Sequence, residues 1–368
     1  MPTPAEPFSG SLLDKAEPTD HGSIRVALNC AILQRGVSGT ANTVRAIAQA
    51  LTGEQGIELI EAAPVSERSP SRILNAGRAA IWDLWRAGRS AKHIDVLISP
   101  CNIGRAPRGV GHLLVVQDTM VLDYPHLFDP GYAAYARVLL GLSVRGATRV
   151  LTASHHACKC IRRRWPQARV TVIGWPAPAQ VGGAPRALDA EPLTVLMVGA
   201  TEPHKNHVGG IEAVRLARLL TGADLRLEII GPPGRAEGVL QGLLRVVDPR
   251  GLWATRRGTV SWSGLTHAYG RAWALLQPSL HEGFGLPVLE AAGHGLPVIH
   301  TGASSLSEVC PAGDAGGSAP ELLAAGLRRL LDPAAYKTAS LASVEAATSR
   351  SPEAFASALR SVVEEVAG

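Results

Sequence analysis

Short apolar runs rich in β-branched residues recur along the chain, with stretches of helical periodicity between them. Nearly continuous apolar runs are typical of strands buried on both faces of a parallel sheet, and the intervening helices supply the crossover connections. The pattern therefore predicts an α/β protein with two doubly wound parallel sheets. The predicted strands are residues 24–29, 93–100, 112–118, 149–154 and 170–174 in a first series, and residues 194–200, 225–231, 259–264, 273–279 and 297–301 in a second.

The two series are separated by residues 174–192, GWPAPAQVGGAPRALDAEP, which contain too much Pro, Gly and Ala for a strand or a helix. A length of 368 residues fits two domains, and a hinge between them predicts a ligand cleft at the carboxyl ends of the strands. We therefore divide the chain into a loose extension (1–23), an N-terminal domain (24–175), a linker (176–192), a C-terminal domain (193–345) and a final helix that could pack back on the N-terminal domain (346–368).

Charge and cysteine content narrow the functional classes. Lys and Arg number 36 against 31 Asp and Glu, and the net charge of +5 fits an anionic partner without identifying it. This charge is too diffuse for a nucleic-acid reader, so we expect no nucleic-acid partner. The five cysteines include no C-x-x-C pair, and the N-terminus lacks the apolar core of a secretory signal. We therefore expect a cytoplasmic protein, and no apolar stretch is long enough to cross a membrane.

The most informative segment is residues 278–297, PSLHEGFGLPVLEAAGHGLP. It places Glu282, Gly283 and Gly285 in a loop between a predicted strand and a predicted helix. The glycines allow the backbone to approach a ligand closely, and the free N–H groups at the helix start favour an anion or a sugar hydroxyl. Glu282 on the loop and Glu290 about one turn into the helix could contact different parts of one extended ligand. The spacing alone fits a capped surface turn equally well.

This segment resembles the E-x7-E signature of family GT4 of retaining glycosyltransferases, which have the GT-B fold of two facing Rossmann-like domains with an interdomain cleft. The similarity continues through the following G-x-PV and through SSLSEV (304–309). Other segments that resemble the family are VLMVGATEPHKN (195–206), QDTMVLDYPHLF (117–128) and RVLTASHHACKCI (149–161). The resemblance covers nearly all of residues 24–330.

The resemblance implies a role for each matched residue of the C-terminal domain. Glu290 would bind the ribose hydroxyls of a nucleotide, and Glu282 would contact the transferred sugar. Lys205 matches the lysine that holds the diphosphate, where a fixed cation stabilises the leaving group without a metal. Backbone N–H groups of the intervening loop would hold sugar hydroxyls and the diphosphate. These amides belong to Gly283, Phe284 and Gly285.

The N-terminal domain matches the family with several departures. The segment at residues 32–51, with Gly36 and Gly39 before a predicted helix, resembles the family's N-terminal glycine loop, which lies near the donor phosphates and the acceptor. Gln117 and Asp118 stand where many relatives carry a His-Asp pair, and a glutamine can form hydrogen bonds but cannot titrate. Many relatives also have an Arg close to the lysine. This chain has Ala200 and His204 at those positions, and Arg235 is one candidate to replace the missing cation.

The resemblance implies a retaining, metal-independent hexosyltransferase that needs no cofactor besides its co-substrate, a nucleoside-diphosphate sugar. The wording of the EPxKN and SSLSEV segments resembles mannosyltransferases that use GDP-mannose. The acceptor would be a glycan or a lipid-linked glycan in bacterial surface polysaccharide assembly. Two alternatives stay open, a catalytically degraded GT-B protein that binds a nucleotide sugar or scaffolds a partner transferase, and a GT-B epimerase or phosphorylase.

Two basic stretches suggest peripheral contact with the inner face of an anionic cell membrane. Residues 72–92 place Trp82 and Trp85 among arginines, and the cluster at residues 159–164 could extend that surface. The competing interpretation is that the apolar residues pack into the core while the charges face water. A second cluster, His155, His156, Cys158 and Cys160, lacks a second ligand pair elsewhere and does not support a zinc site.

Overall fold

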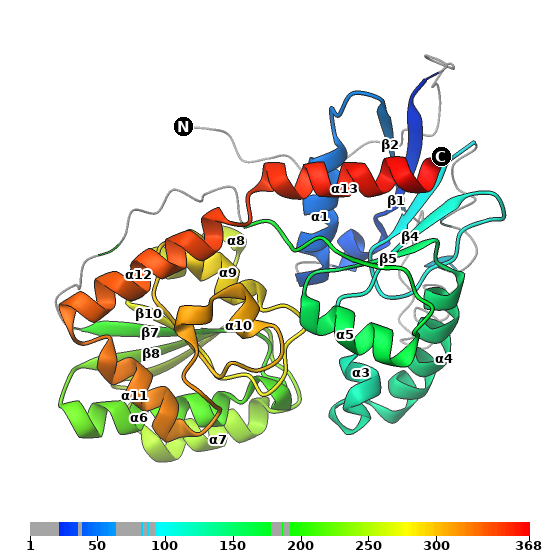
Figure 1. Ribbon diagram of the computed structural model, residues 1–368. Coiled ribbons are helices and arrows are strands. Elements are labelled where there is room, and N and C mark those ends of the chain that lie inside the picture. Colours follow the sequence, from blue (N-terminus) through cyan, green and yellow to red (C-terminus); the bar gives the residue numbers. More distant parts are fainter. Residues whose placement is uncertain are drawn as a thin grey trace.

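The computed structural model describes residues 22–35, 39–63, 82, 83, 87, 93–177, 186 and 192–368. It contains two α/β domains that lie side by side, each with one parallel sheet between helices (Figure 1). The predicted fold class is therefore confirmed. Residues 36–38, in the segment that resembles the glycine loop, lie outside the described residues. So do most of residues 64–92, which include the predicted basic stretch at 72–92.

The N-terminal sheet has six parallel strands in the order β2-β1-β3-β4-β5-β6. Its strands are β1 (Ile24–Asn29), β2 (Ile57–Ala62), β3 (Val96–Ser99), β4 (Gly111–Val115), β5 (Arg149–Thr152) and β6 (Val170–Val172). Strand β2 was not predicted, because its sequence IELIEA carries two glutamates and only its last residue is buried. The helices are η1 (Ala31–Arg35), α1 (Gly39–Leu51), α3 (Met120–Asp123), η4 (Pro125–Leu127), α4 (Pro130–Gly146) and α5 (His155–Arg164).

The C-terminal sheet has five parallel strands in the order β11-β10-β7-β8-β9. Its strands are β7 (Leu193–Val198), β8 (Leu225–Ile230), β9 (Ala254–Gly258), β10 (Ala274–Gln277) and β11 (Val298–His300). The helices are η5 (Pro203–Lys205), α6 (His207–Thr221), α7 (Glu237–Val247), α8 (Trp262–Arg271), α9 (Leu286–Gly293), α10 (Leu306–Val309), η6 (Pro311–Gly313), α11 (Pro320–Arg329), α12 (Pro333–Thr348) and α13 (Pro352–Ala367).

The prediction of a strand at residues 259–264 is wrong. The strand lies earlier, as β9, and helix α8 begins within the predicted segment. Ser261 is the N-cap of that helix, and its hydroxyl accepts a hydrogen bond from the N–H of Gly264. A capping serine satisfies an N–H group that the first helical turn leaves free, and this local bond favours the helix over an edge strand.

The chain crosses between the domains twice. After the linker it forms the C-terminal domain, and α13 then returns to pack against α1, β3 and β4 of the N-terminal domain, where it is drawn in red in Figure 1. Phe355 of α13 packs against Trp175, which precedes the linker, with ring centroids 5.7 Å apart. The N–H of Ala177 donates to the carbonyl of Arg350 at 2.8 Å, so the two crossings are bonded to each other.

The prediction that Trp82 lies on a membrane-binding surface is wrong. Its side chain is only 9% exposed, and its indole N–H donates to Asn29 Oδ1 at 2.9 Å. A tryptophan that is buried and bonded to a strand end inside the domain cannot insert into a bilayer. Trp85 and the arginines of residues 72–92 lie outside the described residues.

Candidate functional site

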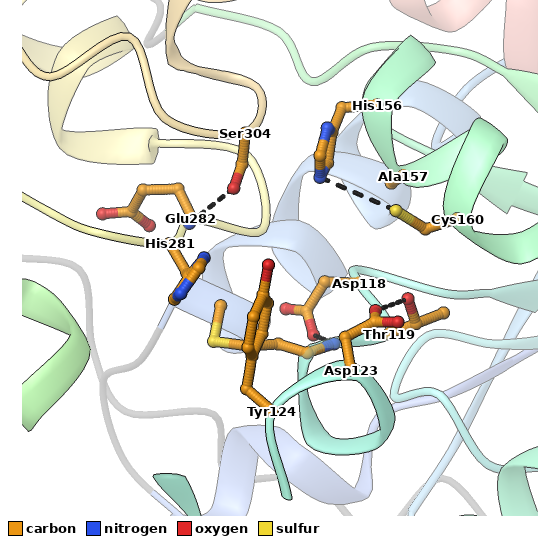
Figure 2. A pocket seen from close by; sticks show the side chains of 11 residues that line it. Asp118, Thr119, Asp123, Tyr124, His156, Ala157, Cys160, His281, Glu282 and Ser304 are labelled. Atoms are coloured by element: carbon orange, nitrogen blue, oxygen red, sulfur yellow. Dashed lines mark hydrogen bonds between the residues drawn. The ribbon is translucent and has the colours of Figure 1, made fainter. Parts of the chain in front are cut away.

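A pocket opens between the two domains and encloses about 270 Å³ of empty space, including open solvent at its mouth. In Figure 2, the His281 ring lies against Tyr124 of the other domain, and the Ser304 hydroxyl points to the backbone nitrogen of Glu282, whose carboxylate is directed away from Asp118. The N-terminal domain contributes Asp118, Thr119, Met120, Asp123, Tyr124, His156, Ala157 and Cys160, and the C-terminal domain contributes His281, Glu282 and Ser304.

Glu282, which lines this pocket, forms an ion pair with the partly buried Lys205. The ammonium group of Lys205 donates to both carboxylate oxygens of Glu282, at 2.7 and 2.8 Å. Gln277 and Ser279 each donate a further hydrogen bond of 2.7 Å to Glu282 Oε1. Burial by itself would raise the pKa of Glu282, but the charge of Lys205 and these hydrogen bonds outweigh it and lower the pKa. Glu282 is therefore a fixed, ionised acceptor for hydroxyl groups.

The loop that follows Glu282 is held in place from residues 304 and 305. Ser304 accepts the N–H of Glu282 at 3.3 Å, and Ser305 donates to the carbonyls of Gly283 and Phe284. Gly285 precedes α9 with a φ of +96°, a backbone conformation that favours glycine. The Phe284 side chain is buried in the core, so any ligand contact from residues 283–285 must come from the backbone.

Glu290 lies on α9 and does not line the interdomain pocket. Its carboxylate is buried and accepts a hydrogen bond of 2.8 Å from the hydroxyl of Tyr269 on α8. Burial raises the pKa of Glu290, and the bond from Tyr269 opposes that rise. The two glutamates are therefore presented from different places on one loop and helix, as their spacing predicts.

Asp118 of the N-terminal domain lies against the loop of residues 283–285 in the C-terminal domain. Its Oδ1 accepts the N–H of Met120 at 2.8 Å, and a Cβ placed on Gly283 would lie 2.7 Å from its Oδ2. Burial raises the pKa of Asp118, and the negative charge of Glu282 raises it further. The structure therefore brings together Asp118, Glu282 and Lys205 from both domains.

Gln117 and Gly39 lie outside the pocket lining. The side-chain amide of Gln117 donates to Thr43 of α1 and accepts from the indole of Trp175, both at 3.2 Å. These two hydrogen bonds connect α1 to the start of the linker. They do not direct the Gln117 side chain to a substrate. Gly39 is the first residue of α1.

The cation predicted to replace the family arginine is engaged elsewhere. Arg235 forms an ion pair of 2.9 Å with Glu202 and donates to the carbonyl of Leu127 in the N-terminal domain. Burial and the neighbouring Lys205 lower the pKa of His204 to about 4, so this ring is neutral at physiological pH. Lys205 is therefore the cation bonded to Glu282 at this site.

Sequence reasoning missed an aromatic contact across the pocket. The rings of Tyr124 and His281 stack with centroids 3.7 Å apart, and Cys160 Sγ lies 3.6 Å from His156 Nε2. No spacing rule relates residues 124 and 281, and only the domain arrangement brings them together. Within the described residues, no group of three His, Cys, Asp or Glu side chains is placed to hold a metal ion.

The sequence is similar to proteins of known activity over part of its length. Residues 184–339 match the family described as glycosyl transferases group 1. The O-antigen chain mannosyltransferase B of Escherichia coli is 37% identical over 121 residues, which cover 33% of this chain and 31% of that protein. The O-antigen chain mannosyltransferase RfbU of Salmonella typhimurium is 30% identical over 193 residues, or 50% of each chain. The matches thus span a third to a half of these relatives.

Solved structures share the arrangement of both domains. The sucrose-phosphate synthase of Thermosynechococcus elongatus superimposes with a TM-score of 0.70 at 18% identity, over 93% of this chain and 98% of that one. Anabaena HepE, solved in complex with UDP and glucose, gives a TM-score of 0.66 at 14% identity, over 93% and 100%. The chain therefore has the GT-B fold, and its residues 184–339 match the glycosyl transferases group 1 family.

Proposed function

We propose that the protein is a retaining, metal-independent hexosyltransferase that moves mannose from GDP-mannose to a hydroxyl of a glycan or lipid-linked acceptor in bacterial surface polysaccharide assembly. The observation that carries this proposal is the ion pair between Lys205 and the buried Glu282, next to the loop that Asp118 approaches from the other domain. The mannosyltransferase relatives support the choice of sugar.

The geometry suggests how the C-terminal domain would act on a nucleoside-diphosphate sugar. An ammonium group has three donors, and Lys205 directs two of them to Glu282. The remaining donor is available to a diphosphate, whose negative charge grows as the bond to the sugar breaks. Glu282, ionised and fixed, would accept hydrogen bonds from hydroxyls of the sugar. The acceptor hydroxyl would attack the anomeric carbon from the face that the diphosphate leaves, and its proton would pass to the departing phosphate oxygen.

A thermal-shift series tests the donor assignment. A ligand that binds only the folded state raises the melting temperature, so GDP-mannose should raise it more than UDP-glucose at equal concentration. Glu290→Gln should weaken the affinity by about 10-fold to 100-fold, and so reduce the thermal shift, because it replaces one of two oxygen acceptors for the ribose hydroxyls by an amide NH₂ group. Tyr269→Phe keeps the carboxylate and should retain binding. An undiminished response in Glu290→Gln would contradict the assigned nucleotide contact, and a larger response to UDP-glucose would contradict the assigned base.

We also propose peripheral contact with an anionic membrane, through helix α4. Val138 and Leu142 lie one turn apart on this helix, and each is 58% exposed. Arg137 and Arg145 flank them, and Arg163 of α5 is exposed in the same domain. An apolar stripe bordered by cations fits the surface of an acidic bilayer. In the described residues no helix is long and apolar enough to cross one.

Co-sedimentation with phosphatidylglycerol vesicles tests this contact. The protein should bind these vesicles, binding should fall with salt because the attraction is partly electrostatic, and Leu142→Asp should abolish it. Leu341→Asp, at an exposed leucine of the C-terminal domain, is the matched control and should bind normally. Equal binding of the two variants would exclude α4 as the membrane surface.

A further inference from the structure

Glu308 bonds the C-terminal domain to a helix of the N-terminal domain. It projects from α10 and accepts the backbone N–H groups of His155 and His156, both at 2.7 Å, with one carboxylate oxygen for each. These are the first two residues of α5, and Ser154 accepts the N–H of the third, Ala157. The first N–H groups of a helix have no partner within the helix and carry partial positive charge, so a carboxylate stabilises them. Here that carboxylate comes from the other domain.

The segment that carries Glu308 also holds the loop that follows Glu282. Ser304 accepts the N–H of Glu282, and Ser305 donates to two carbonyls of residues 283 and 284. Ser304 has a φ of +57°, a conformation that non-glycine residues seldom adopt and that is often found at functional sites. Ser304, Ser305 and Glu308 thus connect the loop that follows Glu282 to α5. Figure 1 shows α10 and α5 facing each other between the domains.

The same segment is bonded to both crossings of the chain. The guanidinium of Arg350 donates to the carbonyls of Glu308 and Val309. Arg350 lies between α12 and α13, where the chain leaves the C-terminal domain, and its own carbonyl accepts the N–H of Ala177 at the first crossing. A change in the angle between the domains would therefore act on Glu308 from two sides, through α5 and through the hinge.

We propose that Glu308 is a positioning residue that couples domain closure to the catalytic loop. When α5 docks on its carboxylate, the 304–308 segment is fixed, and Ser304 and Ser305 hold Glu282 and its loop in the geometry needed for transfer. This inference rests on the proposed transferase function. Helix α5 also supplies His156 and Cys160 to the pocket. The same contact therefore positions these two side chains relative to Glu282.

Two variants interrupt the contact from opposite sides. Glu308→Gln removes the charge and leaves one acceptor oxygen. His155→Pro removes one of the two donors, and its ring Cδ takes the place of the N–H that met Glu308 Oε2, so it also pushes the carboxylate away. Proline is favoured at the first position of a helix, and Ser154 already has the extended backbone (φ −140°, ψ 154°) that a following proline requires, so the variant should fold. Glu345→Gln makes the same charge change at an exposed position of α12 and is the matched control.

The expected result is a selective loss of turnover. Each variant should lower kcat by about 10-fold to 100-fold, and leave the dissociation constant of GDP-mannose within about 2-fold, because the donor binds within the C-terminal domain. The double variant should be little worse than either single one, because both interrupt a single contact. Glu345→Gln should match the wild type. Wild-type kcat in either variant, or a parallel loss of donor affinity, would overturn the proposal.

Small-angle X-ray scattering tests whether Glu308 controls domain closure, independently of whether the protein transfers sugar. With GDP-mannose bound, the wild type should be more compact than Glu308→Gln and His155→Pro, whether or not sugar is transferred. If the wild type transfers no sugar, the proposed function fails, and the scattering then decides whether Glu308 controls closure. Identical radii of gyration for the wild type and both variants would overturn that role.

Discussion

Replacing Lys205 by Ala should lower kcat by about 10³-fold, with a much smaller effect on acceptor KM. Removal of one preorganised donor to a developing negative charge typically costs about 10²-fold to 10³-fold in turnover. Here the substitution also leaves the buried carboxylate of Glu282 without its cation, and the two effects act together. Lys205→Arg should rescue little, because a guanidinium can bond both oxygens of Glu282 but is larger and holds its donors in one plane, so its other donors do not lie where the third ammonium donor does.

The pH dependence of turnover provides the sharper measurement. In the wild type the pKa of Glu282 is lowered, so the carboxylate stays ionised as the pH falls to its usual titration range. Without Lys205, burial and the nearby Asp118 should raise that pKa, so the acid limb of the kcat profile should move to higher pH. Glu282→Gln should abolish this limb and lower kcat to a similar extent. An acid limb that does not move in Lys205→Ala would contradict the role of the pair.

Replacing Gly231 by Ala should cause the largest loss of stability that we predict. A Cβ at this position would lie 2.0 Å from the carbonyl oxygen of Gly199, and the φ of Gly231 is +149°. Both glycines follow strands β8 and β7, and the N–H of Gly199 donates to the carbonyl of Ile230 at 2.9 Å. The backbones must therefore separate, at a cost of more than about 3 kcal/mol of the free energy of unfolding.

Urea denaturation compares this variant with a glycine in open space. Gly242 lies inside α7 with no atom within 4 Å of an added Cβ, so Gly242→Ala should be stabilised by up to about 1 kcal/mol. The contrast matters for the site, because Gly199 lies beside the side chain of Lys205, whose Cδ and Cε are 3.8 Å from an added Cβ. Equal midpoints for Gly231→Ala and the wild type would show that the two strand ends can separate freely.

The fold was predictable from the sequence wherever a strand is fully buried. Strands such as β3 and β10 are buried along their whole length and are recognised as apolar runs. Strand β9 (ATRRG) lies at the sheet edge with arginines, and the apolar residues after it belong to a capped helix. Strand β2 is likewise an edge strand with glutamates. Edge strands carry less of the apolar signal on which such predictions depend.

The site was predictable where one continuous segment supplies its residues. Glu282 and its loop follow from the motif, and Lys205 from its flanking sequence. The wall opposite Glu282 depends on how the domains meet, which no local pattern encodes. Tyr124 and His281 stack from different domains, and Gln117 turns away toward Thr43 and Trp175. Trp82 was misassigned because an amphipathic pattern does not tell whether its apolar face meets a membrane or the core.

The most direct test of the account is to follow the sugar itself. The protein would be incubated with GDP-mannose labelled with ¹³C at the anomeric carbon, together with mannose-terminated oligosaccharides, and the products examined by NMR and mass spectrometry. The account predicts release of GDP and a new α-linked mannose, because the donor is α-linked and the configuration is retained, with neither product formed by Lys205→Ala. Saturable binding of GDP-mannose without transfer to any acceptor, or a β-linked product, would contradict it.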